Sequence, residues 1–385
     1  MRTSNVRTPI AGHNGTIFVA LELSQRSWLV TMHSPDKDRF SRHKLEGGDD
    51  VGLLGLIERI RGRATQALGA VPSVVSCYEA GYDGFWLHRR LVGAGITNFV
   101  FDPASIAVDQ RARRVKTDRI DGELLLRTLM SHWRGEPRVV RIVHVPTPEQ
   151  EDARRTTRER ERLIKEQTAH TNRIKALLRL VGVGAGNPRR RDWMAWLKAQ
   201  RERNGDPLRP HLVAELAREH ARLKLVGEQL RELGQATDAA PVSDAAAEMA
   251  RRSAMLQRLK SLGPVFTATL TNEVFYKDFH NRREVASYVG LAPSPWRSGG
   301  TNREQGISKA GNPRARQKAI ELAWLWLKHQ PDSALSRWFH ERTAQGKGRI
   351  KRIAIVALAR KLIAALWRFL TTGLVPEGAV LKAVA

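Results

Sequence analysis

The first part of the chain alternates short apolar runs with amphipathic stretches, a pattern typical of an α/β domain. The run Ile17-Phe18-Val19-Ala20-Leu21 is wholly apolar, as in a short strand buried on both faces. Segments 28–33 and 39–44 flank a polar turn and predict two antiparallel strands. Asp83 is a candidate N-cap for a helix that ends at Gly93 or Gly95. We expect the later elements in the order helix, strand, helix and strand, over 51–68, 74–78, 83–95 and 97–101.

The middle of the chain has a helical pattern. Residues 149–181 form a long charged stretch, and leucine and valine recur with heptad-like spacing from Leu212 to Leu233. This spacing predicts two long helices that pair as a coiled coil, either within one chain or between two chains. A loop-rich segment containing Arg189-Arg190-Arg191 separates them, and residues 235–245 have the composition of a linker.

The last part of the chain, residues 250–372, is expected to be mostly helical. Asn312 followed by Pro313 predicts an N-cap and the first position of a helix. The patterns together predict α/β plus α. They divide the chain into a mixed-sheet domain over 1–145, a helical coiled-coil spacer with a linker over 146–245, and a mostly helical domain over 246–385.

The charge of the chain indicates the kind of partner. Lys and Arg number 65 against 39 Asp and Glu, which gives a net charge of +26. Such a surplus repels itself and is best tolerated when a polyanion neutralises it, so we expect a nucleic-acid partner. A basic membrane-surface protein is the rival interpretation, but no strongly amphipathic basic helix or lipid-anchor motif supports it.

The sequence also narrows the compartment and the chemistry. A single cysteine, Cys77, excludes a disulfide within the chain and a thiolate-rich zinc site. The N-terminal residues lack the apolar core of a signal peptide, and the apolar stretch 353–370 is interrupted by basic residues. We therefore expect no membrane span, and a location in the bacterial cytoplasm, associated with the nucleoid.

Four carboxylates occupy positions that favour a site. Glu22 and Glu79 each end a predicted strand, and Asp118 and Asp121 share one face at the start of a helical stretch. Strand ends and helix starts converge at one edge of an open sheet, where α/β sites form. Each acid taken alone is better explained as a surface or capping residue, and the acidic pair also fits a salt-bridged helix face.

Four converging carboxylates need cations between them, and Mg²⁺ suits such oxygen donors. Two such ions about 4 Å apart serve phosphoryl transfer by activating the nucleophile and stabilising the leaving oxygen. The basic residues around the aspartate pair would bind phosphates and bring the nucleic-acid backbone to the metals. They are Arg111, Arg113, Arg114, Lys116 and Arg119.

The order Glu22, Glu79 and Lys116-Thr117-Asp118-Arg119-Ile120-Asp121 resembles the DEDD transposases of bacterial insertion sequences and the related Piv-type DNA invertases. The resemblance implies an RNase H-like (RuvC-like) first domain whose acidic tetrad binds metal. The chain departs from the family pattern in one respect, since the family usually has Asp in the first strand where this chain has Glu22. The extra methylene moves the carboxylate by roughly one bond length, about 1 Å or more.

A second set of motifs resembles the C-terminal transposase domain of the same family. It consists of Tyr288 to Pro293, Arg297-Ser298-Gly299-Gly300, and Gly306 to Asn312. The family has a Pro-Gly turn upstream, where this chain has the order Gly263-Pro264. Together with the helical spacer, the two resemblances cover nearly the whole chain.

The resemblance implies that Ser298 attacks DNA and forms a phosphoserine link. Gly299 and Gly300 would let a backbone approach closely, and Arg297 would bind the scissile phosphate, with Arg303 and Lys309 as further nucleic-acid contacts. From the residues alone, Ser298 is equally an ordinary loop serine, and Ser294 and Ser308 compete for the role.

The resemblance as a whole implies a transposase that recombines donor and target DNA as a dimer or tetramer, guided by a structured RNA. Two alternatives stay open from the sequence. One is a RuvC-like hydrolase in which metal-activated water attacks and Ser298 is idle. The other is a non-catalytic nucleic-acid-binding protein whose acids are structural.

Overall fold

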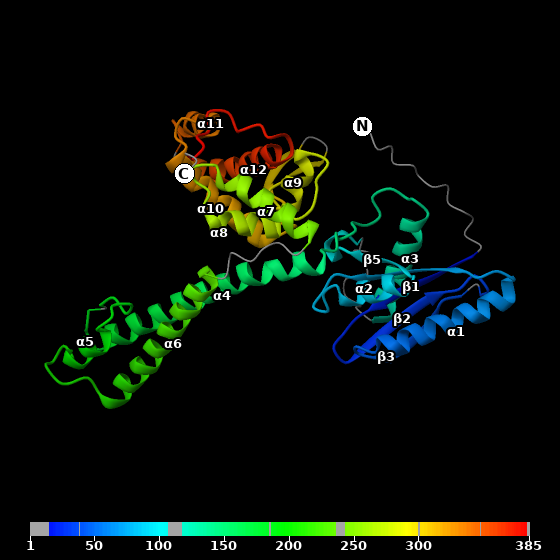
Figure 1. Ribbon diagram of the computed structural model, residues 1–385, viewed down its shortest axis with the longest axis horizontal. Coiled ribbons are helices and arrows are strands. Elements are labelled where there is room, and N and C mark those ends of the chain that lie inside the picture. Colours follow the sequence, from blue (N-terminus) through cyan, green and yellow to red (C-terminus); the bar gives the residue numbers. More distant parts are fainter. Residues whose placement is uncertain are drawn as a thin grey trace. The chain divides into compact units, whose positions relative to one another are not determined.

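The computed structural model describes residues 15–37, 39–106, 118–184, 186–235, 243–298, 301–346 and 348–382. For residues 118–120, 235, 296–298 and 301–305 it describes the backbone alone. The chain divides into two compact units, residues 1–145 and residues 146–385, whose elements are labelled in Figure 1.

The first unit is built on a five-stranded mixed sheet of order β3-β2-β1-β4-β5. Strands β1, β2 and β3 are antiparallel, whereas β4 and β5 run parallel to β1, so the predicted mixed sheet is confirmed. The third strand begins two residues later than predicted, because Met32 pairs with Ser41 and residues 34–40 form the connection. The strand bounds are Thr16–Glu22, Ser27–His33, Ser41–Glu46, Ser73–Glu79 and Thr97–Phe101.

Helices cover both faces of this sheet. The first and second helices, α1 (Asp50–Leu68) and α2 (Trp86–Gly93), pack on the face that carries Trp28. The third, α3 (Asp118–Trp133), packs on the opposite face, which carries Phe18 and Ala20. Successive strand residues point to opposite faces, so β1 supplies apolar side chains to both cores.

The expected helix cap at Asp83 is wrong. The second helix begins at Trp86, and its N-cap residue Phe85 makes no side-chain capping bond. Gly84 has φ of 66°, in the left-handed region, which separates Asp83 from the helix. The Tyr78 hydroxyl donates to the Gly84 carbonyl at 3.1 Å and fixes this turn. A short 3₁₀ helix, η2 (Pro103–Ser105), follows β5.

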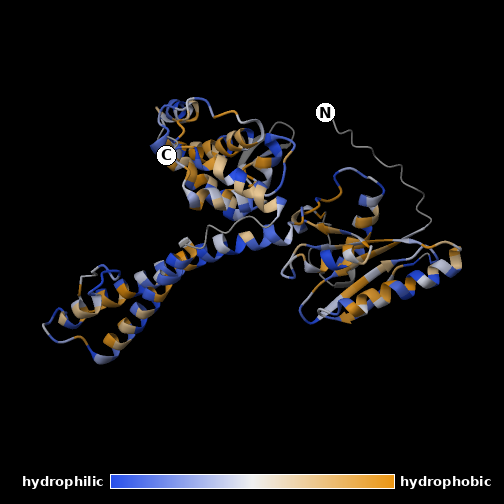
Figure 2. Cartoon of the chain, viewed as in Figure 1, coloured by the Kyte–Doolittle hydropathy of each residue, from blue (hydrophilic) through white to orange (hydrophobic). Residues whose placement is uncertain are grey.

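The second unit starts with a helical hairpin made of α4 (Pro148–Leu180) and α6 (Pro210–Gln235), with the short α5 (Trp193–Ala199) between them. The start of α4 is fixed by a capping box between Thr147 and Gln150. The hydrogen bond between His170 and Glu219 and the ion pair between Arg173 and Glu215 show that α4 and α6 lie antiparallel. Figure 2 shows that much of α4 is hydrophilic and that hydrophobic positions recur in α6 and in the part of α4 beside it. Coiled-coil geometry stays a prediction.

The rest of the second unit is mostly helical, around one apolar core that includes Trp326, Leu358 and Phe369. A two-stranded hairpin interrupts the helices and was not predicted, because its polar, proline-containing sequence lacks apolar alternation. The predicted linker lies largely outside the described residues, which resume at residue 243. The elements are α7 (Asp244–Gln257), α8 (Pro264–Glu273), α9 (Arg282–Tyr288), β6 (Pro293–Ser298), β7 (Thr301–Ile307), α10 (Pro313–His329), α11 (Ala334–Thr343) and α12 (Gly348–Thr372).

Candidate active site

Glu22 and Glu79 end two neighbouring parallel strands. The register pairs Leu21 with Tyr78, so the two glutamates follow at the next position on β1 and β4. Neighbouring strands lie about 4.8 Å apart. Each glutamate comes two residues after a core residue on the α3 face, Ala20 or Cys77, and therefore belongs to that same face. The structure brings these two predicted site residues together.

The start of α3 lies over the end of β1. A Cβ added to Gly122 would come within 2.5 Å of the Thr31 Oγ1 atom and 3.7 Å of the Leu29 Cδ2 atom. Leu29 is the cross-strand partner of Glu22. Asp121, half-buried and adjacent to Gly122, is therefore held near the same edge of the sheet. An ion pair between Arg42 on β3 and Glu123 also fastens this end of the helix.

Asp118 is the first residue of α3, one turn before Asp121, and its backbone alone is described. Within the described side chains, no three of the residue types His, Cys, Asp and Glu gather closely enough to hold a metal ion. Arg111, Arg113, Arg114 and Lys116 lie outside the described residues, and the side chain of Arg119 does too. The geometry around this edge therefore rests on Glu22, Glu79 and Asp121.

The thiol of Cys77, the single cysteine, differs from the nearby carboxylates in its protonation. Complete burial raises the pKa of Cys77 well above its usual value, and the negative charge of Glu79 raises this pKa further. The thiol therefore stays protonated at neutral pH, so Cys77 is neither a nucleophile nor a thiolate ligand.

Ser298 is the last residue of β6 and pairs with Thr301 across the hairpin. Arg303 pairs with Trp296, and Arg297 pairs with Asn302. By strand alternation, positions 298 and 303 share one face of the ribbon, while position 297 belongs to the other. Gly299 and Gly300, which join the strands, lie outside the described residues.

The two other parts of the C-terminal signature lie side by side. The Ser308 backbone N–H donates to the Ala292 carbonyl at 2.8 Å, and the Lys309 N–H donates to the Gly290 carbonyl at 3.2 Å. Lys309 is exposed, with φ of 55°. A Cβ on Gly311 would lie 2.3 Å from the Tyr288 carbonyl oxygen, so only glycine fits there. The turn from β7 into α10 is thus held by backbone contacts.

Comparison with known proteins identifies the kind of molecule that carries this arrangement. Residues 253–338, which contain the hairpin and the following turn, match the transposase IS116/IS110/IS902 family. The chain is 47% identical over 376 residues to the "Putative transposase y4rJ" of Sinorhizobium fredii, covering 96% of this chain and 95% of that protein. The chain belongs to this family of transposases.

More distant relatives extend the comparison over most of the transposase. This chain is 24% identical over 345 residues to the transposase for insertion sequence element IS1328 of Yersinia enterocolitica, and the match covers 88% of this chain and 96% of that protein. This chain is also 26% identical over 371 residues to the transposase for insertion sequence element IS1111A of Coxiella burnetii, and the match covers 93% of this chain and 94% of that protein. Transposases act on DNA. In the described part of this transposase, no helix is long and apolar enough to cross a membrane.

Sequence reasoning missed Glu273, a buried anion next to the signature turn of the transposase. The residue is 1% exposed, and its side chain accepts hydrogen bonds from Arg158 on α4 and from the Asn312 side chain, the latter at 2.8 Å. The Asn312 Oδ1 atom meanwhile caps α10 by accepting from the Arg314 and Ala315 N–H groups. Glu273 is the only charged residue of α8, and this isolation was the available signal.

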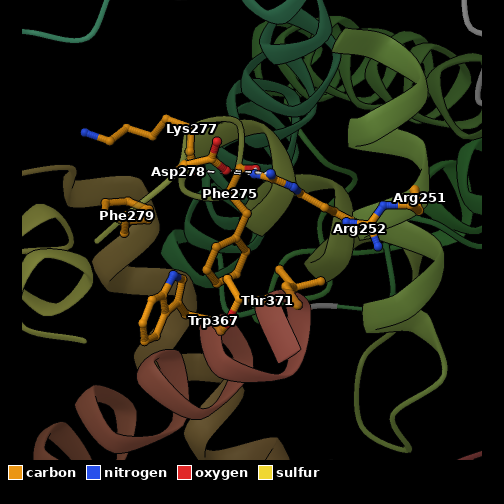
Figure 3. Close-up of a pocket in the computed structure, with 9 residues that line it drawn as sticks. Arg251, Arg252, Phe275, Lys277, Asp278, Phe279, Trp367 and Thr371 are labelled. Carbon is orange, nitrogen blue, oxygen red and sulfur yellow. Dashed lines mark hydrogen bonds and ion pairs between the residues drawn. The ribbon is translucent and has the colours of Figure 1, made fainter. Parts of the chain in front are cut away.

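The transposase also has a pocket of about 200 Å³ between α7, the segment after α8 and the end of α12 (Figure 3). Phe275, Phe279 and Trp367 form its apolar part, and Arg252 reaches Asp278 at its rim at 2.6 Å. Among the described residues that line it, none was selected from the sequence. The pocket is therefore separate from the motifs that suggest chemistry.

Proposed function

We propose that this transposase cuts and rejoins DNA strands with an acidic, magnesium-binding tetrad and a serine nucleophile. The observation that carries the proposal is the side-by-side position of Glu22 and Glu79 at two parallel strand ends, on the face where α3 begins. The sheet, three antiparallel strands continued by two parallel ones, is compatible with an RNase H-like, RuvC-like domain.

The tetrad consists of Glu22, Glu79, Asp118 and Asp121. Its carboxylate oxygens are the hard donors that Mg²⁺ prefers. Two bound ions would supply activation of the nucleophile and stabilisation of the leaving oxygen. The proposed nucleic-acid contacts before and within the first turn of α3, Arg111, Arg113, Arg114, Lys116 and Arg119, would hold the phosphate backbone beside these carboxylates.

Ser298 performs the covalent step. Its Oγ atom attacks the scissile phosphorus, an Oγ–P bond forms, and the bond from phosphorus to the leaving strand breaks. The hydroxyl proton passes to a carboxylate base, and the leaving strand takes the electron pair. Attack by a second strand hydroxyl then releases the serine, so strands are joined without ATP. Among the proposed nucleic-acid contacts of the second unit, Arg297, Arg303 and Lys309, Arg303 shares the face of Ser298.

A structured RNA is the proposed guide that selects donor and target DNA. The charge of +26 is suited to holding RNA and DNA together. We further propose that the transposase works as a dimer or tetramer on the bacterial nucleoid. Sequencing of the RNA that copurifies with the protein tests the guide, and a single defined small RNA is expected.

The deciding experiment mixes the protein with labelled DNA that carries both ends of its own element and resolves the products on a denaturing gel. The parent is expected to form a covalent protein–DNA adduct, and Ser298→Ala is expected to bind DNA without forming one. Ser294→Ala and Ser308→Ala are matched controls that keep the adduct. Recombination without any adduct in the parent would favour attack by water, as in a metal-dependent hydrolase.

A further inference from the structure

The segment between α4 and α6, residues 187–209, carries an unusual concentration of positive charge. It contains seven basic and three acidic residues. All seven basic residues are exposed on the surface. We call this segment the basic tip; its exposed basic residues are Arg189, Arg190, Arg191, Lys198, Arg201, Arg203 and Arg209.

The basic tip is folded around a core of its own. Trp193, Leu197 and Leu208 are buried against residues of α4 and α6. The Trp193 ring stacks on His220 with ring centroids 4.6 Å apart and an interplanar angle of 23°. The Arg203 N–H donates to the Val181 carbonyl at 3.1 Å, which ties the tip to the end of α4. The backbone that carries the basic side chains of the tip is therefore fixed by packing and hydrogen bonding.

Ion pairs neutralise few of these charges. Arg190 pairs with Asp192, and Arg209 lies 3.5 Å from Glu202. For the other five, Arg189, Arg191, Lys198, Arg201 and Arg203, the described residues provide no acidic partner within ion-pair distance. On the helical shaft of the same hairpin, three arginines do pair with glutamates, and these serve as paired reference positions: Arg162 with Glu166, Arg173 with Glu215, and Arg222 with Glu219.

This concentration of unpaired positive charge suggests a ligand. Five cationic groups on one small platform repel one another, and their repulsion is relieved when a polyanion lies across them. A membrane surface would also be anionic, but the exposed face of the tip carries basic groups without the broad apolar face that interfacial helices bury. Guanidinium groups form strong charge-assisted hydrogen bonds with phosphate oxygens, and a nucleic-acid backbone offers many such oxygens.

We propose that the basic tip is a phosphate-binding surface that anchors nucleic acid, in addition to the contacts near the tetrad and the serine hairpin. The contacts are to the sugar-phosphate backbone and therefore position the strand without reading its sequence. The proposal uses the DNA-directed activity of the family and depends neither on Ser298 nor on Mg²⁺. The same chemistry is offered by duplex DNA and by structured RNA.

The test compares two triple variants of the full chain. One is Arg189→Gln, Arg191→Gln and Arg203→Gln in the tip. The other is Arg162→Gln, Arg173→Gln and Arg222→Gln on the shaft, which removes the same net charge from paired positions. Dissociation constants are measured for a duplex DNA and for a folded RNA over a range of KCl concentrations, and thermal unfolding of each variant is recorded.

The tip triple is expected to reduce the slope of log K against log salt by about 2 to 3, because each lost duplex phosphate contact removes about 0.9. Binding should weaken by roughly tenfold or more at physiological salt. The shaft triple should change the slope by less than about 1. A reduced slope with DNA alone, RNA alone or both supports the proposal and tells which polymer lies on the tip.

An unchanged slope on both polymers, or an equal change in the two triple variants, overturns the proposal. The single variant Arg191→Gln, with an expected slope change of about 1, covers the case in which the triple unfolds. Adduct formation at saturating protein should persist in the tip triple. If the parent protein itself forms no adduct, the serine mechanism is contradicted. The comparison of salt slopes still tests the basic tip.

Discussion

The Glu273 carboxylate of α8 accepts two hydrogen bonds from the Arg158 guanidinium of α4, at 2.7 and 3.1 Å. Burial would raise the pKa of Glu273, but the hydrogen bonds from Arg158 and Asn312 and the guanidinium charges hold it below its usual value. The carboxylate therefore stays ionised inside the second unit. It joins the base of the helical hairpin to Asn312, the cap of α10.

Replacing Glu273 with Ala should destabilise the second unit by about 1–3 kcal/mol, because the partly exposed Arg158 guanidinium and the capping amide of Asn312 lose their shared acceptor. Denaturant unfolding followed by circular dichroism measures the loss. Glu321→Ala, which removes a more exposed glutamate of α10 paired with Lys318, is the matched control and should lie within about 0.5 kcal/mol of the parent. Equal stability of the two variants would show that the Glu273 pair is dispensable.

The ion pairs of Glu248 on α7 should make the free energy of unfolding depend on pH. Hydrogen bonds from Arg251, and then from Arg252, outweigh partial burial and lower the pKa of Glu248 to about 2. A carboxyl whose folded pKa is depressed adds stability above its unfolded pKa, and this contribution disappears as pH falls through the folded pKa. The stability gap between the parent and Glu248→Gln should therefore be widest near neutral pH and close between about pH 5 and pH 2.

Urea unfolding at a series of pH values measures this gap. Solvent screens the partly exposed pair, so the gap will be smaller than a buried pair would produce. Glu341→Gln, at an exposed position of α11, is the control and should follow the parent across the series. A gap that stays constant down to pH 2 would contradict the assignment to Glu248.

The close contact at Gly122, near the start of α3, should make even a small side chain there destabilising. Gly122→Ala would place a methyl group 2.5 Å from the Thr31 hydroxyl, so the helix or the Thr31 side chain must shift, at a cost of about 1–3 kcal/mol. To the extent that the helix shifts, Asp121 moves with it, so DNA cleavage should fall as well. The measurements are thermal unfolding and a strand-cleavage assay in Mg²⁺.

The double variant Thr31→Ala with Gly122→Ala removes the obstructing oxygen and should recover most of both losses. Gly62→Ala on α1 has no atom within 4 Å of the added carbon and should be neutral or stabilising. If the double variant is no better than Gly122→Ala alone, the effect does not arise from this contact.

The proposed tetrad makes a prediction about metal. Asp118→Ala and Asp121→Ala should abolish cleavage in Mg²⁺ while nucleic-acid binding persists, because their carboxylates hold the metal and the basic residues hold the backbone. Glu22→Asp should keep at least partial activity, since it restores the residue usual in the family. Plasmid nicking with Mg²⁺ and with a chelator measures this, and normal nicking by Asp118→Ala would overturn the two-metal hypothesis.

Prediction from the sequence succeeded where the signal is local. The strand over 74–78 and the helix over 51–68 lie within the observed β4 and α1, because hydrophobic periodicity reports which faces are buried. Prediction failed at Asp83, where the left-handed conformation of Gly84 decided the helix start. It also missed the hairpin β6–β7, because the polar, proline-containing sequence of its strands lacks apolar alternation.

The sequence by itself determined the basic charge, the α/β-then-helical order and the position of Glu22 and Glu79 at strand ends, since these follow from composition and local periodicity. Only the tertiary structure decided that the two glutamates are neighbours, that Gly122 lies against Thr31, and that Glu273 meets Arg158. Contacts between residues this far apart in sequence depend on strand register and helix packing. Register and packing depend on how all the elements bury their apolar faces against one another, so no local sequence pattern encodes them.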